Sequence, residues 1–512
     1  MSSRTRGARR RAVALFAGSL ISGVAIAFSL PPQRLWYLAP LGLAGLAVAA
    51  ADRPARLRFG VGLLAGLGQF SIASIWAFEF TGWGYLILVV FESILVGIAC
   101  LVAAPTVGRL VGFAAAMTLL EAARDSFPFG GVPLGGVALG QVNGPFLGLA
   151  RVGGPYLLVA AAALLGSALA TIGLGLVRRR QQIRIVALPL ATAIAAIGLV
   201  VIATFLATLA PRGGAGVGHE VVALVQGGGR RGVSSTEVSP TAAYPATLSV
   251  LERIRDAPRL VVTPEDALAL IGPPNRSLRA RHFAEIAARL DATLLAGVTW
   301  PVGRTRFQNE LVAFAPTGRL LTSIEKVHPV PFGEYVPFRS FIEKVVSLNA
   351  VPRDVIVGHS DNVVITPAGR LVLMNSFETF FPKIGRRGVD ARGQLVVVET
   401  NTASYATSQV PAMELAASRI QAVSTGRTVV QSATTGYSAV ISNDGVVTHE
   451  SALGRPDLIV ASVSLREGRT WYDDSGDAPV VVAAAVLLML SWALEPRVRH
   501  ALAPRFRRAR PR

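Results

Sequence analysis

The sequence predicts a multi-pass α-helical membrane protein of about eight transmembrane helices with one inserted α/β domain. Three observations support this fold class. Of the 512 residues, 52% are hydrophobic and only 16% are charged. Apolar runs of roughly 17 to 25 residues, long enough to cross a ~30 Å hydrocarbon layer as helices, fill the first 210 residues and recur near the C-terminus. Between them lies a long segment of nearly balanced charge in which short strand-like and helical stretches alternate.

Eight apolar runs are the candidate transmembrane helices. The second, fifth and eighth are short or rich in Gly and Ala, so their ends are the least defined. The first run follows a cluster of arginines and precedes six more spans, so we expect a retained anchor rather than a cleaved signal peptide. The runs cover about residues 12–30, 36–51, 59–80, 83–104, 110–123, 149–177, 185–210 and 479–492.

The net charge of +19 is concentrated in and beside these runs. Residues 212–477 hold 27 Lys and Arg against 25 Asp and Glu, a net of +2, which leaves 23 basic and 6 acidic residues, a net of +17, for the rest. A nucleic-acid-binding domain needs a solvated basic face, so we expect no nucleic acid partner. The charge instead favours contact with anionic membrane lipids. With eight spans, every arginine-rich flank lies on one side, which predicts cytoplasmic termini and an extracytoplasmic 212–477 segment.

The expected organisation has four parts. The one cysteine, Cys100, lies in an apolar run, which excludes a disulfide framework and a cysteine-ligated metal site. The histidines form no metal-binding pattern, so we expect no metal and no other cofactor. The parts are an N-terminal membrane domain with seven helices (1–211), an extracytoplasmic α/β domain (212–477), an eighth helix (478–495) and a basic cytoplasmic tail (496–512).

The 212–477 segment has the pattern of an α/β domain, because short β-rich runs bounded by Gly, Pro and Asn alternate with helical stretches. Its length of about 265 residues is enough for one unit with a substantial core. Strands are expected at 220–225, 259–262, 293–298, 309–314, 362–365, 371–374, 395–398 and 429–431, and helices at 242–255, 278–290 and 412–424.

Three stretches of this segment place polar groups at strand ends or in a loop. Glu265 follows a strand and Pro264. The stretch 326–337 contains Lys326 and Glu334 among three prolines and a glycine, which indicates a rigid loop. The apolar strand 371–374 continues into Asn-Ser376-Phe-Glu378. Active-site side chains commonly lie at such positions.

These stretches resemble the nitrilase (carbon–nitrogen hydrolase) superfamily, and more narrowly the apolipoprotein N-acyltransferases of bacterial membranes. The most specific match is Lys326-x-His-x-Val-Pro-Phe-Gly-Glu334-Tyr-Val-Pro, and Val225-Gln-Gly227 and Thr425-Gly-Arg427 also match. The resemblance covers essentially the whole chain. It implies a nitrilase-like αββα sandwich inserted before the last of eight helices, in the cytoplasmic (inner) membrane of a bacterium.

The resemblance also implies an activity. The family moves a fatty acyl chain from a phospholipid donor onto the enzyme, and then onto the N-terminal diacylglyceryl-cysteine of a lipoprotein acceptor. Its chemistry uses a Glu-Lys-Cys triad. Carried over by position, Glu265 is the general base, Lys326 stabilises the oxyanion, and Glu334 and Glu378 are supporting acids. Ser376 stands where the family has its nucleophilic cysteine.

The exchange of cysteine for serine leaves two functions open, because a hydroxyl ionises far less readily than a thiol. The first is an acyltransferase that works through an acyl-serine. The alternative is a catalytically impaired homologue that binds lipid or lipoprotein, or scaffolds a membrane partner such as a glycosyltransferase or another acyltransferase. Further departures from the family pattern at Phe129, Thr263, Thr402 and Gln421 indicate natural divergence rather than one engineered replacement.

Each candidate residue also has a structural alternative, which for Lys326 is a plain surface lysine. Glu265 could be an ordinary acid at a helix N-terminus, and Ser376 a buried polar residue at a strand end. Glu334 and Glu378 could cap loops or pair with nearby arginines. His328, beside Lys326, is expected to be structural rather than a base for serine. Glu92 lies inside an apolar run, where an ionisable group is costly and often functional.

Overall fold

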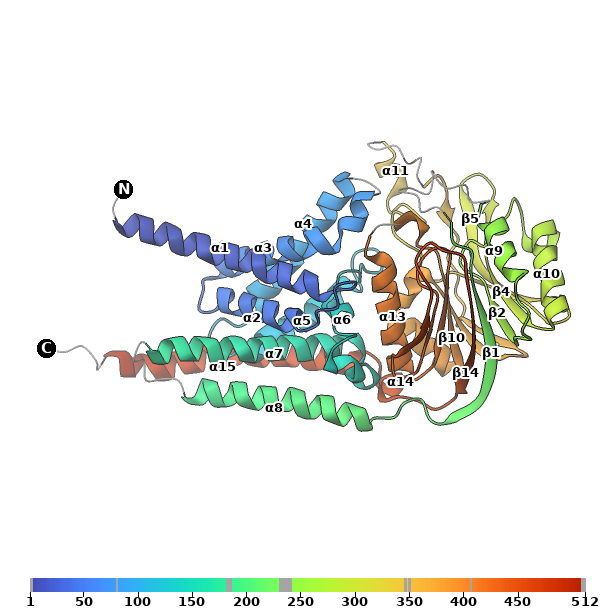
Figure 1. Cartoon of the computed structure of the whole chain (residues 1–512). Helices are drawn as coiled ribbons and strands as arrows, with labels where there is room; N and C mark the ends of the chain where they lie inside the picture. Colours follow the sequence, from blue (N-terminus) through green and yellow to red (C-terminus); the bar gives the residue numbers. More distant parts are fainter. Residues whose placement is uncertain are drawn as a thin grey trace. The chain divides into compact units, whose positions relative to one another are not determined.

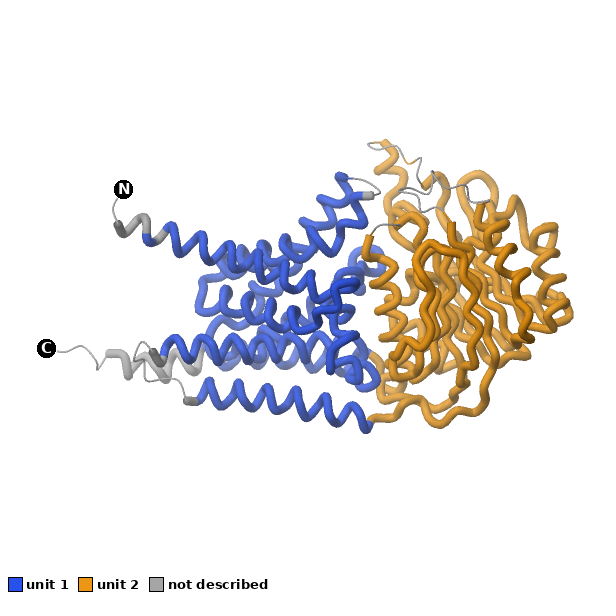
Figure 2. The backbone as a smooth tube through the Cα atoms, viewed as in Figure 1, with its two compact units in different colours: residues 1–209, 477–512 blue, residues 210–476 orange. Residues whose placement is uncertain are grey.

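The computed structural model (Figure 1) contains two compact units, Met1–Leu209 with Asp477–Arg512 and Ala210–Gly476. Figure 2 colours these units separately, and we describe each by itself. The end of the predicted basic tail, residues 508–512, lies outside the described part of the chain. The structure describes residues 3–79, 82–180, 187–229, 242–344, 348, 351–405 and 408–507.

The first unit is helical. Its longest helix, α7, is interrupted where Gly153 and Gly154 leave the helical conformation just before Pro155. Gly154 has φ +66°, which a residue without Cβ adopts without strain. The elements are α1 (Ser3–Ser29), α2 (Leu38–Ala50), α3 (Ala55–Ala73), η1 (Ile75–Glu79), α4 (Gly82–Val102), α5 (Arg109–Arg124), α6 (Val137–Gly140), η2 (Pro145–Leu149), α7 (Ala150–Arg180), α8 (Ala187–Leu209) and α15 (Ala478–Arg507).

Five helical stretches in the described residues are long and apolar enough to cross a membrane. The helix α2 is also apolar but has only 13 residues. The structure therefore supports a membrane-spanning unit, while the predicted count of eight spans stays a prediction. The five stretches are Arg9–Ser29, Gly82–Val102, Pro145–Arg178, Leu188–Leu209 and Ala478–Glu495.

Small residues allow the helices of this unit to pack closely. A Cβ added at Gly66 of α3 would lie 2.5 Å from the Cα of Ser93 on α4, and one added at Gly112 of α5 would lie 2.5 Å from the Ser491 hydroxyl on α15. Lipid tails are as apolar as the helix surfaces, so tight van der Waals contact replaces the hydrophobic effect as the cause of association. Glycines such as Gly66 and Gly112 thus have a packing function.

The second unit contains two β-sheets. The first has the order β14-β1-β2-β4-β5-β6, with β3 on β4 and β7 on β5, and the second has the order β13-β12-β11-β10-β9-β8. The strands are β1 (Gly216–Gln226), β2 (Leu260–Val262), β3 (Leu268–Ala269), β4 (Thr293–Val302), β5 (Arg306–Phe314), β6 (Leu320–Glu325), β7 (Asp354–Val355), β8 (Val363–Thr366), β9 (Gly369–Asn375), β10 (Leu395–Thr400), β11 (Val429–Ala433), β12 (Ala439–Ile441), β13 (Val447–Glu450) and β14 (Asp457–Arg466).

Helices cover the outer faces of the two sheets. One apolar cluster joins the sheets face to face, for example through Leu224 and Val262 of the first and Leu373 and Val397 of the second. A second cluster packs the first sheet against α9 and α10, and α12 and α13 pack on the second sheet. The helices and 3₁₀ turns are α9 (Ala243–Leu251), η4 (Pro274–Arg276), α10 (Leu278–Leu290), α11 (Arg339–Ile342), η5 (Ser376–Phe380), α12 (Pro382–Asp390), η6 (Ala403–Tyr405), α13 (Val410–Thr425) and α14 (Trp471–Ser475).

The result is the αββα sandwich that the resemblance implies. Each strand and helix predicted for this segment is present, with ends that differ by a few residues. The elements without a predicted counterpart are β3, β6, β7, β12, β13, β14, α11, α12, α14 and the 3₁₀ turns. The central strands β1, β2 and β4 run parallel, as do β9, β10 and β11. Parallel strands end at the same edge of a sheet, so the residues that follow β2, β9 and β10 are brought together.

Candidate active site

The candidate site lies where β2, β6, β9 and β10 end. Glu265 follows β2 through Thr263, whose backbone N–H and hydroxyl both donate to the Leu295 carbonyl of β4. Gly297 of β4 passes directly behind Glu265, since a Cβ there would lie 2.5 Å from the Glu265 Cα. Only glycine permits this approach, and the position of the Glu265 backbone is therefore fixed from two sides.

Lys326 is a buried cation held by two carboxylates. Its Nζ donates to Glu265 Oε1 at 3.1 Å and to Glu334 Oε1 at 2.8 Å. The exposed fractions of the side chains are 1% for Lys326, 7% for Glu265 and 14% for Glu334. Three predicted site residues from two segments therefore form one bonded cluster. This placement argues against an ordinary surface lysine and a simple helix N-terminal acid.

Two asparagines complete this cluster, and the sequence did not indicate either. Asn309 of β5 donates through Nδ2 to Glu265 Oε1 at 2.9 Å and to Glu334 Oε1 at 2.7 Å. Its Oδ1 accepts from Asn375 Nδ2 at 2.8 Å, which links the cluster to the end of β9. Asn309 stands between Gln308 and Glu310 in β5, so the sequence carries no signal that singles it out.

The rigid loop after Lys326 is held by the two supporting acids. Glu334 Oε2 accepts from the Val330 N–H at 2.7 Å. Glu378 accepts from the N–H groups of Val327 at 2.7 Å and His328 at 3.0 Å, and its second oxygen accepts from the Asn375 N–H at 2.8 Å. Glu378 therefore bonds to backbone groups, as in the loop-capping alternative, and it connects the Lys326 loop to the turn that carries Ser376.

His328 packs among aromatic rings. Its ring centroid lies 3.9 Å from that of Phe381 and 5.8 Å from that of Phe377. The described contacts of this ring thus fit the structural role expected for it.

Ser376 has an unusual backbone conformation at the start of η5. Its φ is +46°, a region that non-glycine residues rarely occupy and that is frequent at functional sites. Residues 371–375 and 377–382 on either side are all buried, whereas Ser376 is partly exposed. Ser376 is therefore the one partly exposed residue of an otherwise buried strand end.

The hydroxyl of Ser376 bonds to a carboxylate that the sequence did not indicate. Ser376 Oγ donates to Glu414 Oε1 of α13 at 3.0 Å. The Thr400 hydroxyl lies 3.2 Å from Ser376 Oγ and 2.6 Å from both Glu414 oxygens. In the described structure, Lys326 is thus bonded to both Glu265 and Glu334, whereas Ser376 is bonded to Glu414. The two groups meet at the end of β10, where Thr400 is followed by Asn401, whose N–H donates to Glu265 Oε2 at 3.0 Å.

Burial dominates the proton affinities of these acids. Burial raises the pKa of Glu265 to about 8, although the Lys326 charge acts in the opposite direction. Burial also raises the pKa of Glu414 to about 7, against hydrogen bonds from Thr400 and Ser376. The pKa of Glu378 is raised to about 7 for the same reason. Burial by itself would lower the pKa of Lys326, but the charges of Glu265 and Glu334 outweigh it and raise that pKa.

Glu399 is a fourth buried acid near Glu265. It is fully buried at the end of β10, and neither carboxylate oxygen has a hydrogen-bond partner in the described structure. Burial raises its pKa well above the ordinary value, and the charge of Glu265 adds to the effect. A carboxyl group in these surroundings is expected to keep its proton at neutral pH.

Among the described residues, no group of three His, Cys, Asp or Glu side chains could hold a metal ion. The site as described consists of carboxylates, one ammonium, amides and hydroxyls. These groups can transfer protons, stabilise an oxyanion and carry an acyl group on oxygen.

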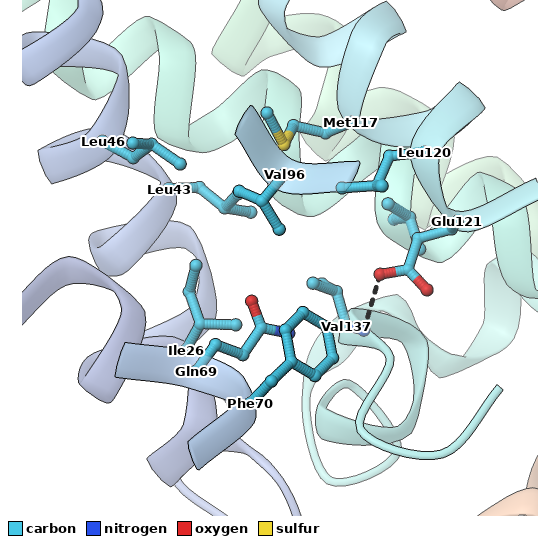
Figure 3. Close-up of a pocket in the computed structure, with 11 residues that line it drawn as sticks. Ile26, Leu43, Leu46, Gln69, Phe70, Val96, Met117, Leu120, Glu121 and Val137 are labelled. Atoms are coloured by element: carbon cyan, nitrogen blue, oxygen red, sulfur yellow. Dashed lines mark hydrogen bonds between the residues drawn. The ribbon is translucent and has the colours of Figure 1, made fainter. Parts of the chain in front are cut away.

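The helical unit contains a separate buried charge cluster. Arg124 of α5 donates through Nε to Glu92 Oε2 of α4 at 2.6 Å and through Nη1 to Glu121 Oε2 at 3.0 Å. Glu121 also accepts from the Val137 N–H at 3.1 Å and lines a small, mostly apolar pocket together with Gln69 (Figure 3). Glu92 is therefore one half of an ion pair, which accounts for a carboxylate inside an apolar helix.

Comparison with known proteins gives two family matches and full-length relatives. Residues 22–169 match the apolipoprotein N-acyltransferase N-terminal domain, and residues 222–473 match the carbon-nitrogen hydrolase family. The apolipoprotein N-acyltransferase of Chromobacterium violaceum is 27% identical over 514 residues, 96% of either chain. That of Azotobacter vinelandii is 27% identical over 522 residues, 95% of this chain and 96% of the relative. A third, from Gloeobacter violaceus, is 32% identical over 234 residues, 45% of this chain and 44% of the relative.

Solved structures are also similar to part of this chain. An amidase from Nesterenkonia sp. is 20% identical, with a TM-score of 0.37, and the match covers 53% of this chain and 97% of the amidase.

Proposed function

Because the chain belongs to the apolipoprotein N-acyltransferase family, we propose the following reaction and roles for its site residues. As a member of that family it is an acyltransferase of lipoprotein biosynthesis, and its apolar helices make it a membrane protein. In the proposed reaction, a fatty acyl chain moves from a phospholipid to Ser376. The chain then moves from Ser376 to the N-terminal amino group of a diacylglyceryl-cysteine lipoprotein.

The observation that carries this proposal is the buried Lys326 ammonium between Glu265 and Glu334. Lysine has three N–H donors, and two of them bond to these carboxylates in the described structure. The third is available to an oxyanion that develops on the substrate carbonyl. In a dry site, such a preorganised donor stabilises charge far better than water does.

The other residues have distinct roles in this proposal. Ser376 is the nucleophile, on a turn where its backbone has a positive φ. Glu265 is the general base, and its raised pKa suits proton removal from the acceptor amine near neutral pH. Glu334 and Glu378 support the site because they hold Lys326 and the loop that follows it.

We place the protein in the cytoplasmic (inner) membrane with eight spans, both termini in the cytoplasm and the 212–477 domain outside. The basic flanks of the apolar segments support this orientation, since arginines gather in cytoplasmic loops. The organisation into 1–211, 212–477, 478–495 and the tail 496–512 follows from the same placement. It gives the catalytic domain access to phospholipid donors and lipoprotein acceptors at the outer face of that membrane.

The test is to detect the acyl-enzyme. Purified full-length protein is incubated in vesicles that contain a phospholipid labelled in its acyl chains, and peptides are analysed by mass spectrometry. We expect one acyl group on the peptide with Ser376 and none after Ser376→Ala, while Ser249→Ala, at an exposed serine, keeps the adduct. Neutral hydroxylamine should release the acyl group from a Ser376→Cys thioester but leave the wild-type oxyester intact.

Two outcomes would contradict the proposal. If only the Ser376→Cys variant is acylated, the wild type is not a serine acyltransferase, and the impaired homologue that binds lipid or scaffolds a membrane glycosyltransferase or acyltransferase is favoured. Full transfer activity in Glu265→Gln would remove the assigned base.

A further inference from the structure

The Ser376 hydroxyl is bonded to Glu414 rather than to the Glu265–Lys326 pair. The bond from Ser376 Oγ to Glu414 Oε1 is 3.0 Å. Thr400 lies against both, with its hydroxyl 3.2 Å from Ser376 Oγ and 2.6 Å from each Glu414 oxygen. The three side chains come from η5, β10 and α13, so the tertiary fold assembles this arrangement.

The carboxylate of Glu265 is occupied by other donors. Its Oε1 accepts from Lys326 Nζ at 3.1 Å and Asn309 Nδ2 at 2.9 Å, and its Oε2 accepts from the Asn401 N–H at 3.0 Å. These bonds hold Glu265 in place as the counter-ion of Lys326. The proton of Ser376, in contrast, already points to an acceptor.

Glu414 is suited to accept a proton near neutral pH. It is 2% exposed, and burial raises its pKa to about 7. Among the charged groups near α13, the Lys326 ammonium acts against burial, because its positive charge lowers the pKa of Glu414. Glu378 of η5 is engaged with backbone N–H groups, and Arg386 of α12 donates to the backbone carbonyl of Asp473 on α14. A base whose pKa lies near the working pH gives the best compromise between availability and strength.

We propose that Glu414 is the catalytic base that deprotonates Ser376 during acyl loading, and that Thr400 positions the two groups. The inference rests on the proposed acyl transfer for its substrate. The proton passes from Ser376 Oγ to Glu414 as Oγ bonds to the ester carbonyl carbon. The bond from that carbon to the glycerol oxygen then breaks, and the departing oxygen takes the proton from Glu414. Glu265 stays the base for the acceptor amine.

The test uses a fluorophosphonate probe, which reacts with activated serine hydroxyls and needs no lipid substrate. The rate of phosphonylation at Ser376 is measured on the full-length protein between pH 5 and 9. In the wild type we expect the rate to rise with pH through about 7 and then level off, as Glu414 loses its proton. Glu414→Gln should lower the rate roughly 100-fold or more and abolish this rise, the usual range for loss of a general base.

Three further variants separate catalysis from folding. Thr400→Val keeps the base but removes the hydroxyl that positions it, and we expect a loss of about tenfold, smaller than the roughly 10²–10⁴-fold contribution of the base itself. Glu265→Gln should abolish transfer to an amine but keep the rise of Ser376 phosphonylation with pH, because Glu414 still accepts the Ser376 proton. Glu285→Gln, at an exposed acid of α10, is the matched control and should behave as wild type.

The Ser376→Cys background distinguishes a catalytic role of Glu414 from a purely structural one. A thiol ionises without help far more readily than a hydroxyl. We therefore expect the factor by which Glu414→Gln slows acyl-adduct formation to be at least ten times smaller in the Ser376→Cys background than in the wild type. An equal loss in both backgrounds, or an unchanged pH profile in Glu414→Gln, would overturn the proposal.

The two proposals fail in different ways. Glu414-dependent phosphonylation without any acyl adduct from phospholipid would leave this inference standing and remove the acyl transfer. An acyl adduct that forms equally well in Glu414→Gln would do the reverse. A wild-type protein that the probe does not label at all would overturn both, since Ser376 would then not be activated.

Discussion

In the helical unit the buried cation is Arg124, and in the α/β unit it is Lys326; each lies between two carboxylates. The donors of Arg124 are directed to Glu92, Glu121 and the carbonyls of Val132 and Leu134. Its guanidinium also lies over the Phe70 ring, 4.8 Å from the centroid. The planar guanidinium is thus surrounded by fixed partners, and its side chain is 0% exposed.

Lys326 is bonded differently. Its ammonium has two carboxylate partners in the described structure, and Glu334 is 14% exposed. An ammonium is a compact charge with three donors that rotate together, whereas a guanidinium has a rigid fork that is satisfied only by matched partners. The comparison teaches that a buried cation whose donors are directed to several fixed partners holds a fold together, while one with a remaining donor is available for chemistry.

Removal of Arg124 should have the largest effect, on stability. In Arg124→Met, Glu92 and Glu121 stay buried without their cation, and removal of one partner of a buried ion pair costs roughly 3–5 kcal/mol. We expect a strongly lowered unfolding temperature in detergent for this variant, compared with Arg56→Met at an exposed position. A stability equal to that of the control would show that the cluster has no structural role.

Removal of Lys326 should affect the rate more than the fold. In Lys326→Met the oxyanion loses its donor, which lowers acyl-enzyme formation roughly 10²–10³-fold. Glu265 can take up a proton, since its pKa is already raised, and Glu334 is partly exposed to solvent, so the domain should still fold. Single-turnover acylation, with Lys344→Met as the exposed control, measures the change. Acylation at the wild-type rate would contradict the distinction between the two cations.

Glu399 should limit stability at neutral and higher pH. Its pKa is raised in the folded protein, so the folded state binds more protons than the unfolded state once the pH exceeds the unfolded value. The stability that this raised pKa contributes is fully present below the pKa of Glu399 in the unfolded chain. It is lost as the pH rises toward the pKa of Glu399 in the folded protein. Glu399→Met should raise the free energy of unfolding by about 1–3 kcal/mol at neutral pH, the range for an unsatisfied buried polar group.

Urea unfolding of the variant and the wild type between pH 5 and 8 checks this prediction. The gain in Glu399→Met should grow with pH. A gain that shrinks as the pH rises would show that Glu399 is ionised and paired in the folded protein.

The smallest effect is expected at His328. In His328→Gln the ring contacts with Phe377 and Phe381 are lost, at a cost of about 1 kcal/mol. The acylation rate should stay within about threefold, with an unchanged pH profile, because the described ring contacts assign this side chain to packing. A profile that loses its inflection near pH 7 would instead identify His328 as the base.

The motif residues differ in how far sequence predicts their role. Lys326 and Glu334 belong to one short loop, and the structure bonds them directly to each other. Other motif residues are structural: Gln226 donates to the carbonyls of Ala452 and Arg455, and buried Arg427 donates to carbonyls at 393, 425 and 468. A sequence motif therefore shows where a residue lies in the fold. Only the contacts of that residue show whether its role is catalytic or structural.

Asn309, Glu399 and Glu414 could not be assigned from sequence. Glu414 lies 38 positions after Ser376 on a helix of mixed composition, and its hydrogen bond depends on how α13 packs beside η5. Asn309 is one of several polar residues in the first half of β5, and Glu399 follows an apolar run in β10. Their partners or lack of partners appear only in the folded domain. Sequence periodicity indicates which face is buried but not what that face contacts.

The sequence by itself determined the class of protein, because runs of apolar residues, their arginine flanks and the strand pattern of 212–477 are local properties of the chain. It also located Glu265, Lys326, Glu334 and Ser376 through short motifs. The tertiary structure decided how these groups are connected. Strand ends that are distant in sequence meet at one edge of each sheet, and there Lys326 is bonded to Glu265 while Ser376 is bonded to Glu414. Hydrogen bonds between side chains depend on distances of a few tenths of an ångström, and only the packed fold sets such distances.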